Sequence, residues 1–178
     1  DGGARVVPLG APLPCVGRDK QVALGDAAGM VFSAHGSGIA QQLLAAHLLA
    51  KTLAQGGDSW AFNRGWQQER AGALCAMVAF RAFSQSLSGE ELRALMTSGV
   101  MGDSLSRATL VQQDPVPSAS EAIAAVQGLA RMPALARRMV PTLARMEALK
   151  AHHWRYPKQP EDLPAWKRRR ERLFGGIT

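Results

Sequence analysis

The first forty residues alternate short apolar runs with segments rich in glycine and proline. Residues 4–9 predict a short strand, and residues 21–24 predict a second, buried strand that ends at Gly25. Residues 10–19 and 29–38 read as loops, because prolines and glycines interrupt the apolar pattern there. The N-terminal part therefore predicts a strand–loop–helix unit.

From Gly38 onward the apolar positions recur with the period of a helix. Residues 38–55 form one apolar helix, with Ile39, Leu43, Ala46, Ala50 and Leu53 on one face and further leucines beside them. Apolar residues cover so much of its circumference that we expect it to be buried on more than one side. Gly56-Gly57 ends it.

The remaining sequence predicts further helices with recognisable caps. Asp58 or Ser59 can cap the next helix, Ser88 and Glu91 form a capping box, and Ser118 or Ser120 can cap a later one. Pro141 is expected to kink or break the helix that contains it. The predicted helices are 60–87, 88–97, 104–111, 118–130, 133–152 and 164–174, with loops at 112–117 and 156–164.

Composition excludes several classes of protein. The 178 residues are 47% hydrophobic and 20% charged, which is incompatible with wholesale disorder and sufficient for a folded core. Cys15 and Cys75 cannot form a disulfide framework, and no Cys/His spacing resembles a zinc site, so we expect no metal. The longest apolar runs, such as residues 71–80, are well short of the roughly 20 residues that span a bilayer.

The net charge of +7 is distributed unevenly. Residues 129–178 hold twelve Lys/Arg and four Asp/Glu, whereas residues 1–128 are close to neutral. Lys167, Arg168, Arg169, Arg170 and Arg172 suggest a solvated terminal helix or a peripheral contact with anionic lipid. Nucleic acid is not an expected partner, because no nucleic-acid-binding module accompanies the basic tail.

Aromatic and histidine residues leave two questions open. Trp60, Phe62, Trp66, Phe80 and Phe83 favour core packing by their spacing, although they could also line an apolar substrate cavity. The adjacent residues 152 and 153 are both histidine, but neighbours on a helix point about 100° apart, which makes them poor partners for one ion.

The segment with the clearest chemistry runs from residue 21 to residue 53. Gly25-Asp26-Ala27-Ala28-Gly29 follows the second predicted strand, and Gly36-Ser37-Gly38 opens the first helix. A carboxylate at a strand end accepts hydrogen bonds from hydroxyl groups, and a helix N-terminus offers N–H groups and partial positive charge to an anion or an electron-rich ring. A tight strand-to-helix connection, with Asp26 as an N-cap or turn residue, explains the pattern equally well.

These residues resemble a known family. Residues 7–14, 22–31 and 36–39 look like the second FAD-contacting block of flavin-dependent oxidoreductases, and are most similar to the geranylgeranyl-reductase-like group. Relatives of that group include aromatic-ring hydroxylases and flavin halogenases. The resemblance implies an α/β FAD-binding (Rossmann-type flavoprotein) fold, of which this mainly α-helical chain is the C-terminal part. Residues 1–55 would complete the FAD-binding domain, 56–112 would be a helical region, and 113–178 a helical region with a basic tail.

The resemblance also implies roles for individual residues. Gly25, Asp26, Ala27, Ala28 and Gly29 would contact FAD, with Asp26 bound to its ribityl chain. The backbone of Gly36, Ser37, Gly38 and Ile39 would face the flavin ring. His35 would lie near that ring, as a substrate contact or proton donor, or as a loop residue without catalytic function. Ser33 and Ser37 depart from the usual family pattern, in which Pro is common at the first position and Glu at the second.

The family's ADP-binding element is not found in this sequence. No Gly-x-Gly-x-x-Gly turn precedes residue 25, and Gln41 stands where Gly36-Ser37-Gly38 would need a third glycine. We therefore expect an N-terminal Rossmann portion, in the same protein or a partner chain, and a small hydrophobic substrate. We also expect a cytoplasmic location, with peripheral contact to a membrane as a further possibility. The alternative hypothesis is a non-catalytic helical interaction module whose basic tail contacts membrane or acidic partners.

Overall fold

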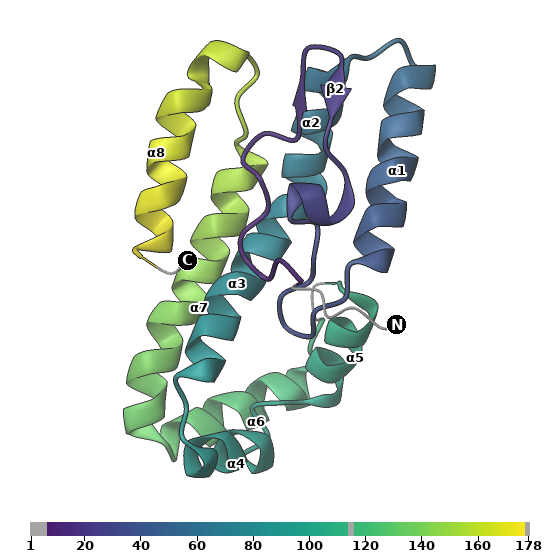
Figure 1. Ribbon diagram of the computed structural model, residues 1–178. Helices are drawn as coiled ribbons and strands as arrows, with labels where there is room; N and C mark the ends of the chain where they lie inside the picture. The colour runs from purple at the N-terminus through teal and green to yellow at the C-terminus, as the bar shows by residue number, and fades with distance from the viewer. Residues whose placement is uncertain (1–6, 114–115, 177–178) are drawn as a thin grey trace, which may run out of the picture. The chain divides into compact units, whose positions relative to one another are not determined.

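The computed structural model describes residues 7–113 and 116–176 and is mostly helical (Figure 1). The chain divides into two compact units, one made of Asp1–Ala79 with Arg145–Thr178 and the other of Phe80–Ala144. The elements are β1 (Gly17–Arg18), β2 (Gln21–Val22), a 3-10 turn (Gly25–Ala28), α1 (Ile39–Ala54), α2 (Ser59–Trp66), a π-helical turn (Gln67–Ala71), α3 (Gly72–Gln85), α4 (Gly89–Thr97), α5 (Asp103–Val111), α6 (Ala119–Ala130), α7 (Pro133–Trp154), a second 3-10 turn (Pro160–Asp162) and α8 (Leu163–Phe174).

The strand predictions are only partly correct. β1 and β2 form an antiparallel hairpin of two residues each, with Gly17 opposite Val22 and Arg18 opposite Gln21. The strand predicted at 21–24 is therefore only two residues long, because the backbone turns into the 3-10 conformation at Gly25. Its first residue, Gln21, is exposed. In the predicted strand at 4–9, residues 4–6 lie outside the described residues and residues 7–9 form no strand.

The helix predictions from residue 38 onward are confirmed, with one correction. Asp58 caps α2 by accepting a hydrogen bond from the Ala61 N–H at 2.8 Å. Ser118 caps α6 in a capping box with Glu121. The helix from Pro133 to Trp154 continues through Pro141, so of the predicted kink or break at that residue the break is wrong.

α1 is packed on one side only, which contradicts the expectation of burial on several sides. Gln41 and Ala45 are buried, but the five apolar residues that define the sequence stripe face outward (Ile39, Leu43, Ala46, Ala50 and Leu53; the outer face of α1). Ile39 is 74% exposed and Leu43 67% exposed. No other element among the described residues of this unit covers the outer face, because only α2 and the first 3-10 turn pack extensively on α1.

The core of the first unit lies between the N-terminal segment and helices α1 to α3. Its largest buried side chains include Phe62, Trp66, Met30 and Leu74, which confirms core packing for the two aromatics. Gly72 allows α3 to lie close to α7, since a Cβ at that position would come within 2.9 Å of the His153 Cβ. Helix packing at this glycine brings α7 against the core.

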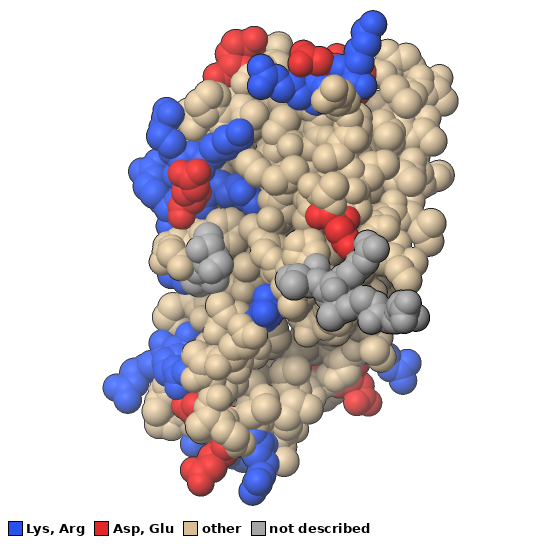
Figure 2. Space-filling model, in the orientation of Figure 1, with Lys and Arg blue, Asp and Glu red and all other residues tan. Residues whose placement is uncertain are grey.

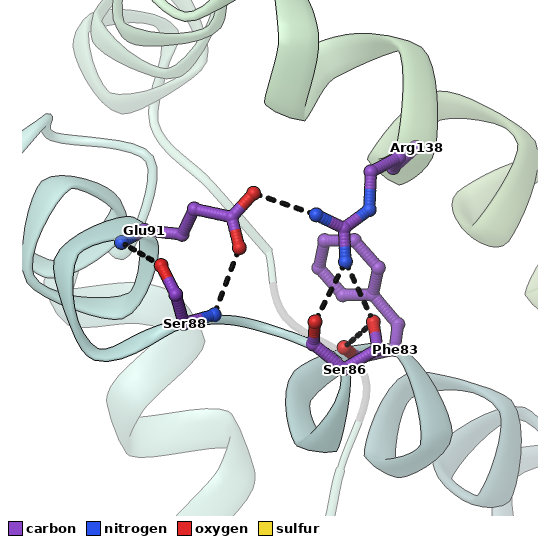
Figure 3. Close-up of polar contacts among 5 residues, drawn as sticks. All are labelled: Phe83, Ser86, Ser88, Glu91 and Arg138. Atoms are coloured by element: carbon purple, nitrogen blue, oxygen red, sulfur yellow. Dashed lines mark hydrogen bonds and ion pairs between the residues drawn. The ribbon is translucent and has the colours of Figure 1, made fainter.

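The second unit is held by a polar cluster at the start of α4 (Figure 3). Ser88 accepts a hydrogen bond from the Glu91 N–H, while the Glu91 carboxylate accepts one from the Ser88 N–H, as the capping box predicts. Arg138 of α7 pairs with Glu91 at 2.6 Å and donates to the Ser86 carbonyl at 2.8 Å. One arginine thus fixes the α3–α4 turn against α7, beside a core that contains Phe83.

Candidate functional site

The 3-10 turn at Gly25–Ala28 is shaped by two glycines in the left-handed region. Gly25 has φ 64° and Gly29 has φ 65°, conformations that other residues adopt only at a cost. The Met30 N–H bonds to the Gly25 carbonyl and the Gly29 N–H bonds to the Asp26 carbonyl, both at 3.0 Å. The turn places Asp26 and Ala27 at the surface and buries Ala28. The Ala28 side chain therefore faces the core of this unit.

The loop that follows closes on itself before α1 begins. Phe32 and Ser37 form an isolated antiparallel bridge, and Gly36, with φ 72°, bonds back to the Phe32 carbonyl at 2.9 Å. The exposed His35 packs its ring on Phe32, with ring centroids 4.8 Å apart. Ser33 is 2% exposed, and its hydroxyl has no hydrogen-bond partner within residues 7–113 and 116–176.

The structure brings the two glycine-containing pieces together. Gln42 of α1 donates a hydrogen bond to the Asp26 Oδ1 at 3.2 Å. A Cβ added to Gly38 would lie 3.2 Å from the Gln42 Nε2 and 3.5 Å from the Asp26 Oδ1. Because Gly38 is the N-cap residue and has no side chain, the N-terminus of α1 stands directly beside the carboxylate of the turn.

The Asp26 carboxylate has one oxygen left for a ligand. Its Oδ1 accepts the Gln42 hydrogen bond, while its Oδ2 makes no hydrogen bond within the part of the chain that the structure describes. Asp26 is exposed, as is Ile39, whereas Gly36, Ser37 and Gly38 are half-buried. This arrangement can accept hydrogen bonds from hydroxyl groups at Asp26 and present backbone N–H groups at the helix N-terminus.

Gln41, the residue that replaces a third glycine, has a structural role. Its side chain is fully buried, and Arg70 of the π-helical turn donates two hydrogen bonds to its Oε1, each 3.2 Å long. A long polar side chain occupies this position because it reaches from α1 to the next helix.

Four polar side chains for which the sequence predicted no role at this site hold residues 12–16 next to the turn. Arg170 of α8 donates to the Pro12 carbonyl at 2.6 Å, and Gln67 donates to the Leu13 carbonyl at 2.8 Å. Residues 12–16 also contact the 3-10 turn directly, because the Leu13 N–H donates a hydrogen bond to the Ala28 carbonyl at 2.9 Å. A Cβ on Gly29 would lie 3.0 Å from the Pro12 Cα.

Asn63 and Tyr156 are the other two side chains that hold residues 12–16 in place. Asn63, fully buried, accepts a hydrogen bond from the Val16 N–H at 2.8 Å and donates one to the Tyr156 hydroxyl at 2.6 Å. The Tyr156 hydroxyl donates to the Pro14 carbonyl at 2.9 Å. Asn63 and Gln67 are four residues apart and therefore share one face of the helix, and this spacing was the available sequence signal for a shared polar partner.

Arg170 also belongs to a buried group with Cys75 and His153, which corrects its assignment to a solvated basic helix. The Cys75 Sγ lies 3.3 Å from the His153 Nε2 and 3.5 Å from an Arg170 nitrogen. Burial raises the pKa of the Cys75 thiol, and burial together with the Arg170 charge holds the pKa of His153 well below its usual value. Both groups are therefore uncharged near neutral pH.

We expect the stability of the first unit to fall on mild acidification. In the unfolded chain a histidine takes up a proton near pH 6.5, but folded His153 resists protonation because it is buried beside Arg170, His152 and Cys75. The stabilisation is complete above pH 6.5 and declines as the pH falls below it, by at most about 1.4 kcal/mol per pH unit for one histidine. Urea midpoints measured from pH 8 to pH 5 should decrease below pH 6.5.

Two variants separate this effect from general acid denaturation. His153→Gln should flatten the decline between pH 7 and pH 5, whereas His47→Gln, which alters an exposed residue of α1, should leave it unchanged. A wild-type midpoint that stays constant down to pH 5 would contradict the prediction.

Neither a metal centre nor a membrane-spanning helix is found in the described parts of the chain. Within residues 7–113 and 116–176, no three His, Cys, Asp or Glu side chains come together as metal ligands. Over the same residues no helix combines the length and apolar character needed to cross a bilayer.

Comparison with known proteins gives one informative similarity. No protein-family model matches the chain. The chain is 23% identical over 175 residues to the digeranylgeranylglycerophospholipid reductase of Sulfolobus acidocaldarius. The match covers 93% of this chain and 38% of the reductase, so the chain spans well under half the length of that curated relative. The similarity supports the reductase-like resemblance at a coarse level and favours an oxidoreductase over the interaction-module hypothesis.

Proposed function

We propose that this chain forms the flavin-ring side of the cofactor site in an FAD-dependent oxidoreductase that acts on a hydrophobic, isoprenoid-type substrate. The observation that carries the proposal is the meeting of the Asp26 turn with the N-terminus of α1. The similarity to a digeranylgeranylglycerophospholipid reductase supports the reaction class and the substrate class.

The residues present fit FAD at this position. Gly38 keeps the helix N-terminus free of side-chain atoms where a Cβ would lie 3.5 Å from the Asp26 Oδ1, and Asp26 retains an oxygen without a partner in the described chain. FAD, when bound, supplies the hydride or electron transfer of such a reaction. Asp26 would accept a hydrogen bond from a hydroxyl of the cofactor's ribityl chain, and the backbone N–H groups at residues 37–39 would face the ring.

Other residues of the site act by positioning. Gln42 orients the Asp26 carboxylate through the 3.2 Å hydrogen bond, and residues 12–16 support the turn from behind. Ala27, exposed in the turn, would let the cofactor approach the backbone closely, whereas Gly25 is buried and Gly29 lies against Pro12. His35 is exposed in the loop before α1, where it would contact substrate or donate a proton.

The exposed outer face of α1 supports the proposal that an N-terminal partner packs on this helix. Five apolar residues at helical spacing lie exposed there, and a soluble protein rarely leaves a contiguous apolar stripe uncovered. The reductase that the chain resembles has more than twice the length that the match covers. We propose that a Rossmann portion, from the same protein or a partner chain, packs on this face and contributes the ADP-binding half of the site.

Leu43→Lys should disrupt this packing. Burying one leucine is worth about 1.5–3 kcal/mol, and a lysine at the same position would lose that energy and add a charge to the contact. We expect the flavin-to-protein ratio of the purified intact protein to fall below half the wild-type value. Leu110→Lys, the same change at another exposed leucine, serves as the matched control and should leave the ratio unchanged. Equal ratios for Leu43→Lys and wild type would contradict the assigned partner face.

The absorption spectrum of the intact protein tests the proposed function. We expect the two visible and near-ultraviolet bands of an oxidised flavin, which bleach when the protein is reduced with dithionite. Addition of an unsaturated isoprenoid lipid to the reduced protein should restore the bands as the substrate is reduced. An intact protein that neither retains added FAD nor changes its spectrum would overturn the proposal.

A further inference from the structure

A groove of about 480 Å³ opens between α7 and α8, away from the Asp26 turn. The two helices lie side by side at the C-terminal end of the first unit (Figure 1). Ala148 and Ala151 of α7 and Ala165 and Leu173 of α8 give the groove apolar walls. None of these four side chains is buried, so their apolar surface is available to a ligand.

Two stacked rings, one from each helix, line the groove. His152 and Trp166 stack with ring centroids 4.6 Å apart and an interplanar angle of 12°. The Trp166 Nε1 donates to the His152 carbonyl at 3.1 Å, and the His152 Nε2 lies 3.0 Å from the Trp166 carbonyl. Two hydrogen bonds and a stacking contact thus join α7 to α8, and the groove they form does not depend on a ligand to hold it open.

The hydrogen bonds also determine what His152 offers to the groove. A carbonyl oxygen only accepts, so the His152 Nε2 must carry the proton, which leaves Nδ1 as an acceptor. This Nδ1 has no hydrogen-bond partner among residues 7–113 and 116–176, although the side chain is only 8% exposed. An acceptor without a partner in the described chain, in the lining of an open groove, is suited to a ligand hydroxyl group.

Two arginines add positive charge. Arg155 and Arg169 line the groove, both are exposed, and neither side chain makes an ion pair or hydrogen bond within the described chain. No acidic residue lines the groove. Figure 2 shows Lys and Arg side chains gathered on the surface over α8. Guanidinium groups without a carboxylate partner are well suited to a phosphate.

We propose that this groove binds one anionic phospholipid from a membrane surface. Arg155 and Arg169 would bind its phosphate, the His152 Nδ1 would accept a hydrogen bond from a headgroup hydroxyl, and its apolar chain would lie along the alanines. A soluble phosphate compound would leave the apolar walls in water, which is why the walls favour a lipid. Trp154, next to Arg155 in the sequence, is 70% exposed, and exposed indoles are typical of segments at membrane interfaces.

Calorimetric titration of the intact protein tests the groove with a soluble lipid. The probe is dihexanoyl phosphatidylglycerol below its critical micelle concentration, which carries a phosphate, headgroup hydroxyls and short chains. We expect saturable one-to-one binding that inorganic phosphate at equal concentration does not displace. Dihexanoyl phosphatidylcholine, which lacks net charge, should bind at least tenfold more weakly.

Paired variants locate the site. Arg155→Gln with Arg169→Gln should weaken phosphatidylglycerol binding at least tenfold. The control, Arg168→Gln with Arg172→Gln, removes the same charge from α8 residues outside the groove and should change the affinity less than threefold. Ala151→Trp fills the groove without changing charge and should also cost at least tenfold, whereas Ala122→Trp on exposed α6 surface should have no effect.

Three results would overturn the proposal, and none of them bears on flavin binding. Absence of saturable binding would exclude a built site. Equal losses in the two arginine pairs, with Ala151→Trp unchanged, would show diffuse attraction to a basic surface only. Displacement by inorganic phosphate at equal concentration would show a site for a soluble anion. Flavin content, measured on the same preparations, should be equal in all variants and reports separately on the proposed oxidoreductase.

Discussion

Replacing Asp26 with alanine in the intact protein is expected to weaken FAD binding about 10- to 150-fold. A hydrogen bond to a charged group contributes about 1.5–3 kcal/mol, which corresponds to that range of dissociation constants. Asp26 is exposed, and the only hydrogen bond of its side chain within the described chain is to Gln42, so the substitution should remove ligand contacts without unfolding the turn. The measurement is a titration of the flavin-free intact protein with FAD, followed by fluorescence quenching.

Further variants distinguish a direct contact from a change in local structure. Asp26→Asn keeps the shape of the side chain and should lose part of the affinity. Asp19→Asn makes the same change at another exposed aspartate, in the β1–β2 turn, and should bind FAD as the wild type does. Gln42→Ala removes the partner that orients Asp26 and should weaken binding less than Asp26→Ala does. Wild-type affinity in Asp26→Ala would rule out the assigned role.

Replacing Asn63 with alanine should destabilise the first unit by about 2–4 kcal/mol. The change leaves the buried Val16 N–H without its acceptor, which costs about 1–3 kcal/mol, and creates a small cavity in the core. Urea unfolding, monitored by tryptophan fluorescence, gives the free energy of unfolding. Gln68→Ala, which removes an exposed hydrogen bond from the same helical stretch to the Trp154 carbonyl, should cost less than about 1 kcal/mol.

A double-mutant cycle tests whether Asn63 and Tyr156 act together. Tyr156→Phe removes the hydroxyl that donates to Pro14 and accepts from Asn63, so part of its cost is already incurred in Asn63→Ala. We expect the two losses to be non-additive by at least about 0.5 kcal/mol. Strict additivity, or a cost of Asn63→Ala no larger than that of Gln68→Ala, would show that residues 12–16 do not depend on this network.

Local patterns were sufficient for most of the helical structure. The capping box at Ser88 and Glu91 and the glycines after α1 act within a few residues of the helix ends that they define. Their hydrogen bonds form between neighbours in the sequence, so they can be predicted without knowing the fold. The two glycine-containing pieces of the candidate site could also be recognised locally, but their contact through Asp26 and Gln42 exists only in the folded chain.

The hairpin and Pro141 show where local patterns were insufficient. The apolar run at 21–24 predicted a buried strand, but the left-handed Gly25 turns the backbone after two paired residues. Pro141 lacks one helical hydrogen bond, yet α7 continues through it, since residues of this helix on both sides of the proline, such as Met139 and Met146, are buried.

By itself, the sequence determined where most helices begin and end and that positive charge gathers at the C-terminal end, and it predicted a site at Asp26 and the N-terminus of α1. The tertiary structure decided which faces and polar groups are buried. The Arg170 side chain, expected on a solvated basic helix, is buried and donates to the Pro12 carbonyl 158 residues away. The strongest apolar stripe of α1 faces outward. The physical reason is that helical periodicity identifies an apolar face without identifying its partner. Burial depends on contacts between residues far apart in the sequence, and those exist only in the folded chain.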